Sequence, residues 1–199
     1  GQVIHQSATL STAAGAVAWN ADGKRYAAGT NGAGGELPEA GEIWVWDTET
    51  GKVLHHFNVK SQVAQGEWAS AGDVTISPDG KRVAVPVTAG SRAKPAGLVI
   101  GDTGASVQVW DLATGNRKQV VSGRTMSVRR VVFSPDGKLL ATAGSDNFVR
   151  VWDIESGKEQ AARSCDGRVT AIAFSPNGQR IAVGIADGSV RIWPVTGIE

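Results

Sequence analysis

Hydrophobic and polar residues alternate with a period of two over many short stretches of this chain. In one such stretch Phe148, Arg150 and Trp152 occupy alternate positions, with valines between them. Successive side chains of a β-strand point to opposite faces, so a period of two indicates strands. Gly is 26 of 199 residues, which is typical of chains with many tight turns. The pattern therefore predicts an all-β protein built from short strands.

One unit of this pattern recurs four times. The tryptophans that close its third strand are separated by 64, 42 and 41 residues, so the two short gaps define the basic unit and the long gap contains insertions. Each unit predicts four strands, termed a to d, joined by turns. The closing tryptophans are Trp46, Trp110, Trp152 and Trp193.

Turn chemistry separates the predicted strands. Strands a and b are joined by Ser-Pro-Asp-Gly or a close variant, in which Pro presets φ and Gly takes a left-handed conformation. The copies run over residues 77–80, 134–137 and 175–178, with a degenerate copy at 20–23. Glycines at 51, 115 and 157 mark a second turn, from strand c to strand d.

These units resemble the WD-repeat (WD40) β-propeller family, in the form found in bacterial members. The signature dipeptides are Trp46-Asp47, Trp110-Asp111 and Trp152-Asp153, and the resemblance covers essentially the whole chain. It implies an all-β propeller of four-stranded antiparallel blades, with four blades per chain. We expect a single domain over residues 1–199, with blade repeats at about 15–59, 72–121, 127–163 and 168–199 and an N-terminal outer strand at 1–6.

The point in the repeat at which the chain starts and stops bears on how the ring of blades is closed. The opening residues 1–5 are similar to 51–55, a predicted strand d, whereas the last copy stops before its own strand d. Three outcomes are open: a self-closed ring of four blades, a homodimer that exchanges terminal strands to make eight, or a part of a larger propeller. We favour the homodimer, because blades of this family pack at angles suited to larger rings.

The chain departs from the family at one polar network. Members often carry a His ahead of strand a that binds an Asp of the b–c turn. Here Arg124 stands at that position in the third repeat, although Asp146 and Asp187 keep the Asp position. We therefore expect Asp146 to bond only within its own turn, and blade cohesion to depend on apolar packing.

Composition and charge exclude several classes of protein. Lys plus Arg is 20 and Asp plus Glu is 19, so a net charge of +1 argues against general binding to nucleic acid or to anionic membranes. Cys165 is the single cysteine, which excludes an intrachain disulfide. No apolar run approaches the ~18 residues of a membrane span. The chain opens at Gly1 without an initiator Met or a signal peptide, so we expect a processed or trimmed soluble product from which a targeting segment has been removed. A cytoplasmic location is favoured.

Candidate catalytic chemistry is sparse. His55 and His56 are adjacent on a predicted strand and point to opposite faces, so they do not share one metal ion. The Gly-rich stretch 29–35 does not fit a dinucleotide-binding spacing. Arg124, Arg129 and Arg130 form only a weak anion-site candidate. We predict no enzyme activity, no cofactor and no metal.

The tryptophans divide into two groups. The four closing tryptophans are predicted to be buried, as is Trp19, which aligns with Phe133 and Phe174. Trp44 stands where other repeats have Gln or Arg, so it indicates either local repacking or a contact surface. Trp68 lies in a connection with no repeat equivalent, where it either fills a small local core or anchors a partner.

Three insertions suggest where function lies. They cover residues 30–41, 60–72 and 88–105, and the family resemblance places all three on one side of the ring. The leading hypothesis is a non-catalytic scaffold or sensor that binds a protein or peptide there. The alternatives are a purely architectural self-assembling propeller and a small-ligand or enzyme site in the axial channel. The candidate contact residues are Trp68, Trp44, Arg92, Lys94, Glu36 and Glu39.

Overall fold

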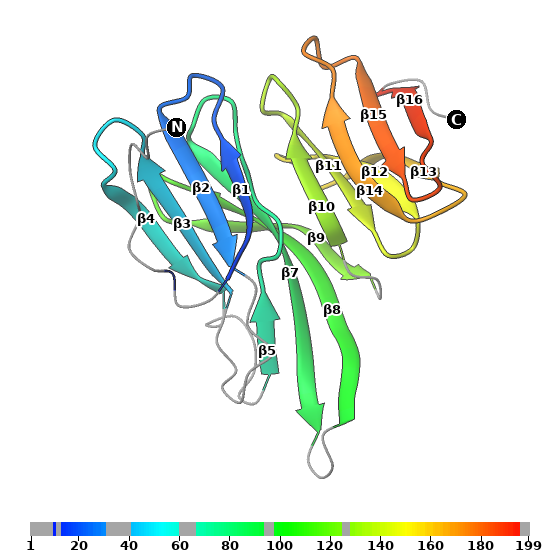
Figure 1. The fold of residues 1–199 in the computed structure, drawn as a ribbon, viewed down its shortest axis with the longest axis horizontal. Coiled ribbons are helices and arrows are strands. Elements are labelled where there is room, and N and C mark those ends of the chain that lie inside the picture. Colours follow the sequence, from blue (N-terminus) through cyan, green and yellow to red (C-terminus); the bar gives the residue numbers. More distant parts are fainter. Residues whose placement is uncertain are drawn as a thin grey trace.

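The computed structural model describes residues 10, 13–30, 41–59, 67–93, 98–124 and 128–195. Their strands form antiparallel sheets that follow one another in chain order as the four blades of a β-propeller (Figure 1). The predicted fold class is confirmed. The predicted outer strand at residues 1–6 lies outside the described residues, so its pairing stays a prediction.

The strands of each blade lie side by side in the order of the sequence, except that the first two strands of blade 2 do not pair with each other and both pair with its third strand. Blade 1 contains β1 (Ala14–Trp19), β2 (Arg25–Thr30), β3 (Glu42–Asp47) and β4 (Val53–Asn58). Blade 2 contains β5 (Glu67–Ser70), β6 (Thr75–Ile76), β7 (Arg82–Ala93), β8 (Leu98–Asp111) and β9 (Arg117–Arg124). Blade 3 contains β10 (Val128–Phe133), β11 (Leu139–Gly144), β12 (Phe148–Asp153) and β13 (Glu159–Ser164). Blade 4 contains β14 (Val169–Phe174), β15 (Arg180–Ile185) and β16 (Val190–Pro194).

The turn between the first two strands of each blade has the predicted chemistry. In blade 3 the Ser134 hydroxyl donates to Asp136 Oδ1 at 2.6 Å and accepts from the backbone N–H of Leu139 at 2.9 Å. Gly137 closes the turn at φ 71°, a left-handed conformation that glycine adopts without strain. Each blade therefore starts from a hairpin whose geometry is specified locally.

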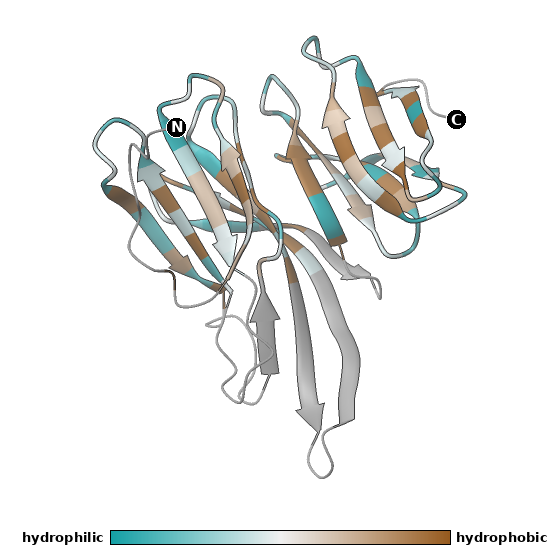
Figure 2. Cartoon of the chain, viewed as in Figure 1, coloured by the Kyte–Doolittle hydropathy of each residue, from teal (hydrophilic) through white to brown (hydrophobic). Residues whose placement is uncertain are grey.

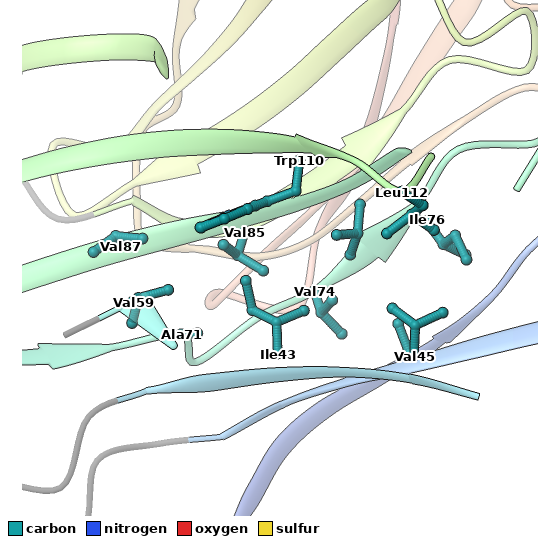
Figure 3. Close-up of a cluster of buried hydrophobic side chains, with 12 residues drawn as sticks. Ile43, Val45, Val59, Ala71, Val74, Ile76, Val85, Val87, Trp110 and Leu112 are labelled. Atoms are coloured by element: carbon teal, nitrogen blue, oxygen red, sulfur yellow. The ribbon is translucent and has the colours of Figure 1, made fainter. Parts of the chain in front are cut away.

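Consecutive blades are held together by three apolar cores. We call the face that a blade turns toward the next blade in the chain its leading face, and the opposite face its trailing face. Between blades 1 and 2, Ile43 and Val45 on the leading face of β3 pack against Val74, Val85 and Trp110 on the trailing face of blade 2 (Figure 3). Equivalent clusters join blade 2 to blade 3 and blade 3 to blade 4. Alternation along each strand thus supplies both interfaces of an inner blade.

Polar contacts supplement these cores, and one of them corrects a prediction. Asp146 does accept from the backbone N–H of Phe148 within its turn, at 3.2 Å. It also forms an ion pair with Arg150 at 2.6 Å, with both side chains largely buried. The expectation that Asp146 bonds only within its turn is therefore wrong. Arg150, two residues before the closing tryptophan, supplies a partner where the family's His is missing.

The two end blades each leave one face exposed. Blades 1 and 4 lie at opposite ends of the series (Figure 1), and in the described residues no apolar core joins them. Trp19, on the trailing face of blade 1, is 58% exposed, so its predicted burial is wrong. The physical reason is that its equivalents Ile76 and Phe133 are covered by the preceding blade, and no blade covers Trp19.

Candidate interaction surface

Blade 2 carries a sheet that continues well beyond the length of the other blades. Strands β7 and β8 have 12 and 14 residues, whereas their counterparts in blade 1 have six each. We call β5 together with residues 88–93 of β7 and 98–105 of β8 the blade 2 extension. In Figure 1 it projects from the side of the propeller on which β7 ends and β8 begins.

Two of the predicted contact residues lie in this extension. Trp68 belongs to β5 and pairs with Gly90 of β7, two residues before Arg92. Arg92 in turn pairs with Val99 of β8. The sequence pattern predicted no strand for the connection that contains Trp68, whereas the structure shows one. The backbone around Trp68 forms strand ladders, which satisfy amide and carbonyl groups that a loop leaves to other partners.

For three other predicted contact residues the structure gives no position. Glu36, Glu39 and Lys94 lie outside the described residues. The b–c ends of blades 1 and 2, where the first and third of the three insertions start, lie on the same side of the propeller in Figure 1. Because three of the six candidate residues are not described, contacts among the six remain a prediction.

Trp44 lies in a row of stacked rings on the trailing face of blade 1. Its ring centroid is 3.7 Å from that of His56 and 6.1 Å from that of Trp46. Trp46 stacks on Tyr26 at 5.0 Å, and Tyr26 contacts Trp19 at 5.4 Å. The row crosses all four strands, so it forms an aromatic surface on one face of the sheet.

Glu42 fixes the end of that aromatic row. Trp44 Nε1 donates to Glu42 Oε2 at 3.2 Å, and His56 Nε2 lies 3.3 Å from Glu42 Oε1. One carboxylate therefore orients both rings. Trp44 is half-buried and has partners within its own blade. These contacts favour the prediction of local repacking, and they also keep the indole in one orientation at the b–c end of blade 1.

Titratable groups in the described ranges serve mainly to build turns. Hydrogen bonds from Thr50 hold the pKa of Asp47 below its usual value, and hydrogen bonds from Ser156 do the same for Asp153. Asp73 differs, because burial raises its pKa. Its Oδ2 accepts from the backbone N–H of Val131 at 2.9 Å, which ties blade 2 to blade 3. Burial also raises the pKa of the Cys165 thiol.

The basic cluster beside blade 3 has a structural use. Arg130 Nε donates to the carbonyl of Thr170 in blade 4 at 3.0 Å, and its Nη1 donates to the carbonyl of Arg129. Arg130 is therefore engaged in joining blades. In the described part of the chain no group of three or more His, Cys, Asp or Glu side chains is placed to hold a metal ion. No helix there is long and apolar enough to cross a membrane.

We call the trailing face of blade 1 and the leading face of blade 4 the end faces. Their exposure is the feature that residue patterns alone did not reveal. Val17 and Trp19 of β1 and Val190 and Ile192 of β16 are large apolar side chains exposed to solvent. Figure 2 shows apolar bands across the strands of both end blades. Alignment of the repeats identifies these positions as apolar, but only the arrangement of blades tells which of them are covered.

Comparison with known proteins supports the repeat assignment. Residues 115–153 and 159–194 match the WD40 family, described as WD domain, G-beta repeat. WD repeat and SOCS box-containing protein 1 of Xenopus tropicalis is 32% identical over 116 residues, 58% of this chain and 22% of that protein. Nuclear distribution protein PAC1 of Arthroderma otae is 40% identical over 57 residues, which is 29% of this chain and 12% of PAC1.

A solved structure shares the fold. Hydrazine synthase of Kuenenia stuttgartiensis superposes with a TM-score of 0.63 at 20% identity, over 89% of this chain and 51% of that one. The chain spans about a fifth of the length of the SOCS box relative and about half of the solved chain. The similarity to the enzyme is one of fold.

Proposed function

Because the chain belongs to the WD-repeat β-propeller family, we propose that it is a non-catalytic scaffold that binds a protein or peptide partner through the blade 2 extension and the adjoining b–c end of blade 1. Proteins of this family generally act as interaction scaffolds. A propeller supplies a rigid platform, and its function comes from sites added to that platform. The partner-binding residues are Trp68, Trp44, Arg92, Lys94, Glu36 and Glu39.

The extension is the observation that supports this surface. Blades 1, 3 and 4 are built from strands of at most six residues, so the distal halves of β7 and β8 are not needed to build a blade. The three-stranded pairing of β5, β7 and β8 holds Trp68 and Arg92 on a regular backbone. Trp and Arg are the residue types that most often contribute a large share of binding energy at protein interfaces.

The rival with an axial-channel site has less support. An acid–base site needs convergent titratable side chains on the inner strands. Asp73 is a half-buried carboxylate beside β6, but it accepts a hydrogen bond from a backbone amide of the next blade. That hydrogen bond gives Asp73 a structural role, which favours the scaffold over the enzyme.

Substitutions in the extension test the proposal. The parent chain and Trp68→Ala, Arg92→Ala and Arg117→Ala are immobilised, and proteins retained from the source cell's lysate are compared. Arg117 is the matched control, because it is exposed in the same blade at the opposite end of β8, where it pairs with Trp110. Trp68→Ala is expected to weaken the partner by about 2 kcal/mol or more, which is roughly 30-fold, while Arg117→Ala retains it.

Thermal melts separate binding from folding. Trp152→Ala serves as the folding control, since removal of a buried aromatic costs about 3–5 kcal/mol. We expect Trp68→Ala to melt close to the parent. If Trp68→Ala melts as low as Trp152→Ala, and no retained protein depends on Trp68, the extension has a purely structural role and the proposal is wrong.

A further inference from the structure

The three blade–blade interfaces use the same sequence positions each time. On the leading face these are one alanine in the second strand and two β-branched residues in the third strand. On the trailing face they include the first and third residues before the a–b turn and the closing tryptophan. The leading-face sets are Ala27, Ile43 and Val45 in blade 1, Ala84, Val107 and Val109 in blade 2, and Ala141, Val149 and Val151 in blade 3.

Blade 4 presents the same leading face without a cover. By position in the repeat, Val190 and Ile192 of β16 are equivalent to Val149 and Val151 of β12. The two blade 3 residues are 4% and 2% exposed, whereas Val190 and Ile192 are 70% and 62% exposed. The face that receives a blade elsewhere in the chain is therefore intact and unoccupied in blade 4.

Blade 1 presents the complementary trailing face with its first strand exposed, while Trp46 at the closing position is 2% exposed and stacks on Tyr26 and Trp44 of its own blade. Val17 and Trp19 of β1 are equivalent to Val131 and Phe133 of β10. The residues in β10 are 5% exposed each, whereas Val17 and Trp19 are 69% and 58% exposed. A trailing face of this kind packs on a leading face in all three existing interfaces.

The a–b turns of the end blades also match one another. A Cβ added at Gly137 or Gly178 meets the proline of the preceding blade's turn, Pro78 or Pro135, at 3.8 and 3.7 Å. In the described part of the chain, a Cβ added at Gly23, the equivalent glycine of blade 1, meets no heavy atom within 4 Å. In blade 4 the equivalent proline is Pro176, so the end blades also match at their turns.

Charges at the edge of the interface match as well. Between blades 2 and 3, Arg82 Nη2 lies 2.8 Å from Glu155 Oε1. Arg180 occupies the position of Arg82 in blade 4 and is exposed. Glu49 occupies the position of Glu155 in blade 1, in a c–d turn of the same form. Joining blade 4 to a blade 1 thus brings opposite charges together in a pairing that the protein already uses.

We propose that a second copy of this chain covers both faces: blade 4 of each copy packs against blade 1 of the other, and the two copies close a ring of eight blades. Apolar, turn and charged positions of the end faces match one another, while both faces are exposed within one chain. Two head-to-tail contacts related by one two-fold axis form a closed assembly. In that assembly the exposed apolar residues Val17, Trp19, Val190 and Ile192 are covered.

Solution mass measured by light scattering tests the assembly. The parent chain is expected at twice its 20.6 kDa. Ile192→Asp on the leading face and Val17→Asp on the trailing face are each expected to run as monomers at concentrations where the parent is dimeric, because each places a carboxylate in an apolar contact. Gln160→Glu, which adds one negative charge to an exposed strand of blade 3, is the matched control and is expected to remain dimeric.

Mixing the two variants tests the head-to-tail arrangement. Blade 4 of Val17→Asp and blade 1 of Ile192→Asp are both unaltered, so an equimolar mixture is expected to recover a dimer held by one intact contact. A monomeric parent overturns the proposal. So does a dimer that only one of the two variants disrupts, since that result indicates pairing of like faces.

If an Asp variant does not fold, cross-linking of two other variants still tests whether blade 4 of one copy meets blade 1 of another. Chains carrying Arg180→Cys and chains carrying Glu49→Cys are mixed and treated with a short bis-maleimide. Arg180 and Glu49 are exposed, and the native Cys165 is buried. The proposal requires an inter-chain product in the mixture above the level of either variant alone, and the absence of that excess overturns it.

Discussion

Trp152 Nε1 donates a buried hydrogen bond to Thr142 Oγ1 at 2.9 Å. The same position in blade 2 is Val85, and the indole nitrogen of Trp110 is buried there without a hydrogen-bond partner among the described residues. The closing tryptophans of blades 2 and 3 therefore differ in whether their N–H has an acceptor, so each blade serves as the reference for a substitution in the other.

Thr142→Val is expected to lower the free energy of unfolding by about 1–3 kcal/mol, because it leaves the Trp152 N–H buried and unpaired. The reciprocal change, Val85→Thr, supplies an acceptor for Trp110 and is expected to stabilise the chain. Urea denaturation of both variants gives the comparison. Loss of stability in both would indicate that volume and polarity at this position outweigh the hydrogen bond.

Asp146→Ala is expected to cost about 2–3 kcal/mol, more than the loss of one turn hydrogen bond, because it also removes the largely buried partner of Arg150. The matched control is Asp187→Ala at the same turn position in blade 4. There Arg191 pairs with Asp166, and Asp187 accepts from Ser189. Denaturation midpoints should fall much further for Asp146→Ala, and equal losses would show that the ion pair adds little.

Two aspartates are expected to respond to acid in opposite directions. The pKa of Asp153 is lowered in the fold by hydrogen bonds from Ser156, so its contribution to stability is present above 3.8, the unfolded value, and is lost as the pH falls through the folded pKa. The pKa of Asp73 is raised by burial, so its contribution is present below 3.8 and is lost as the pH rises through the folded pKa.

Unfolding at pH 7 and pH 3 measures this difference. Asp153→Asn removes a group that weakens the fold on acidification, so the variant should lose less stability than the parent between these pH values. Asp73→Asn keeps an acceptor for the Val131 N–H but removes a group that strengthens the fold in acid, so it should lose more. A parallel pH response of the two variants would contradict the assignment of opposite pKa shifts.

The sequence by itself determined the strands and turns of the repeat unit and the number of blades. These properties are local: Ser134, Asp136 and Gly137 specify one hairpin through bonds within a few residues, and alternation specifies which side chains share a face. The same short-range pattern of strand and turn residues occurs four times, so the assignment of strands in one copy supports their assignment in the others. For the same reason strand c was predicted correctly, with Val149 and Val151 on one face.

Only the tertiary structure decided which of those faces are covered and which polar groups meet. Trp19 and Phe133 occupy the same position in the repeat, yet one is exposed and the other buried, because burial depends on a neighbouring blade. Asp146 was expected to lack a partner outside its turn, yet the sheet surface brings Arg150 to it. Trp68 has no repeat equivalent from which its strand could be inferred, and its conformation follows from pairing with β7.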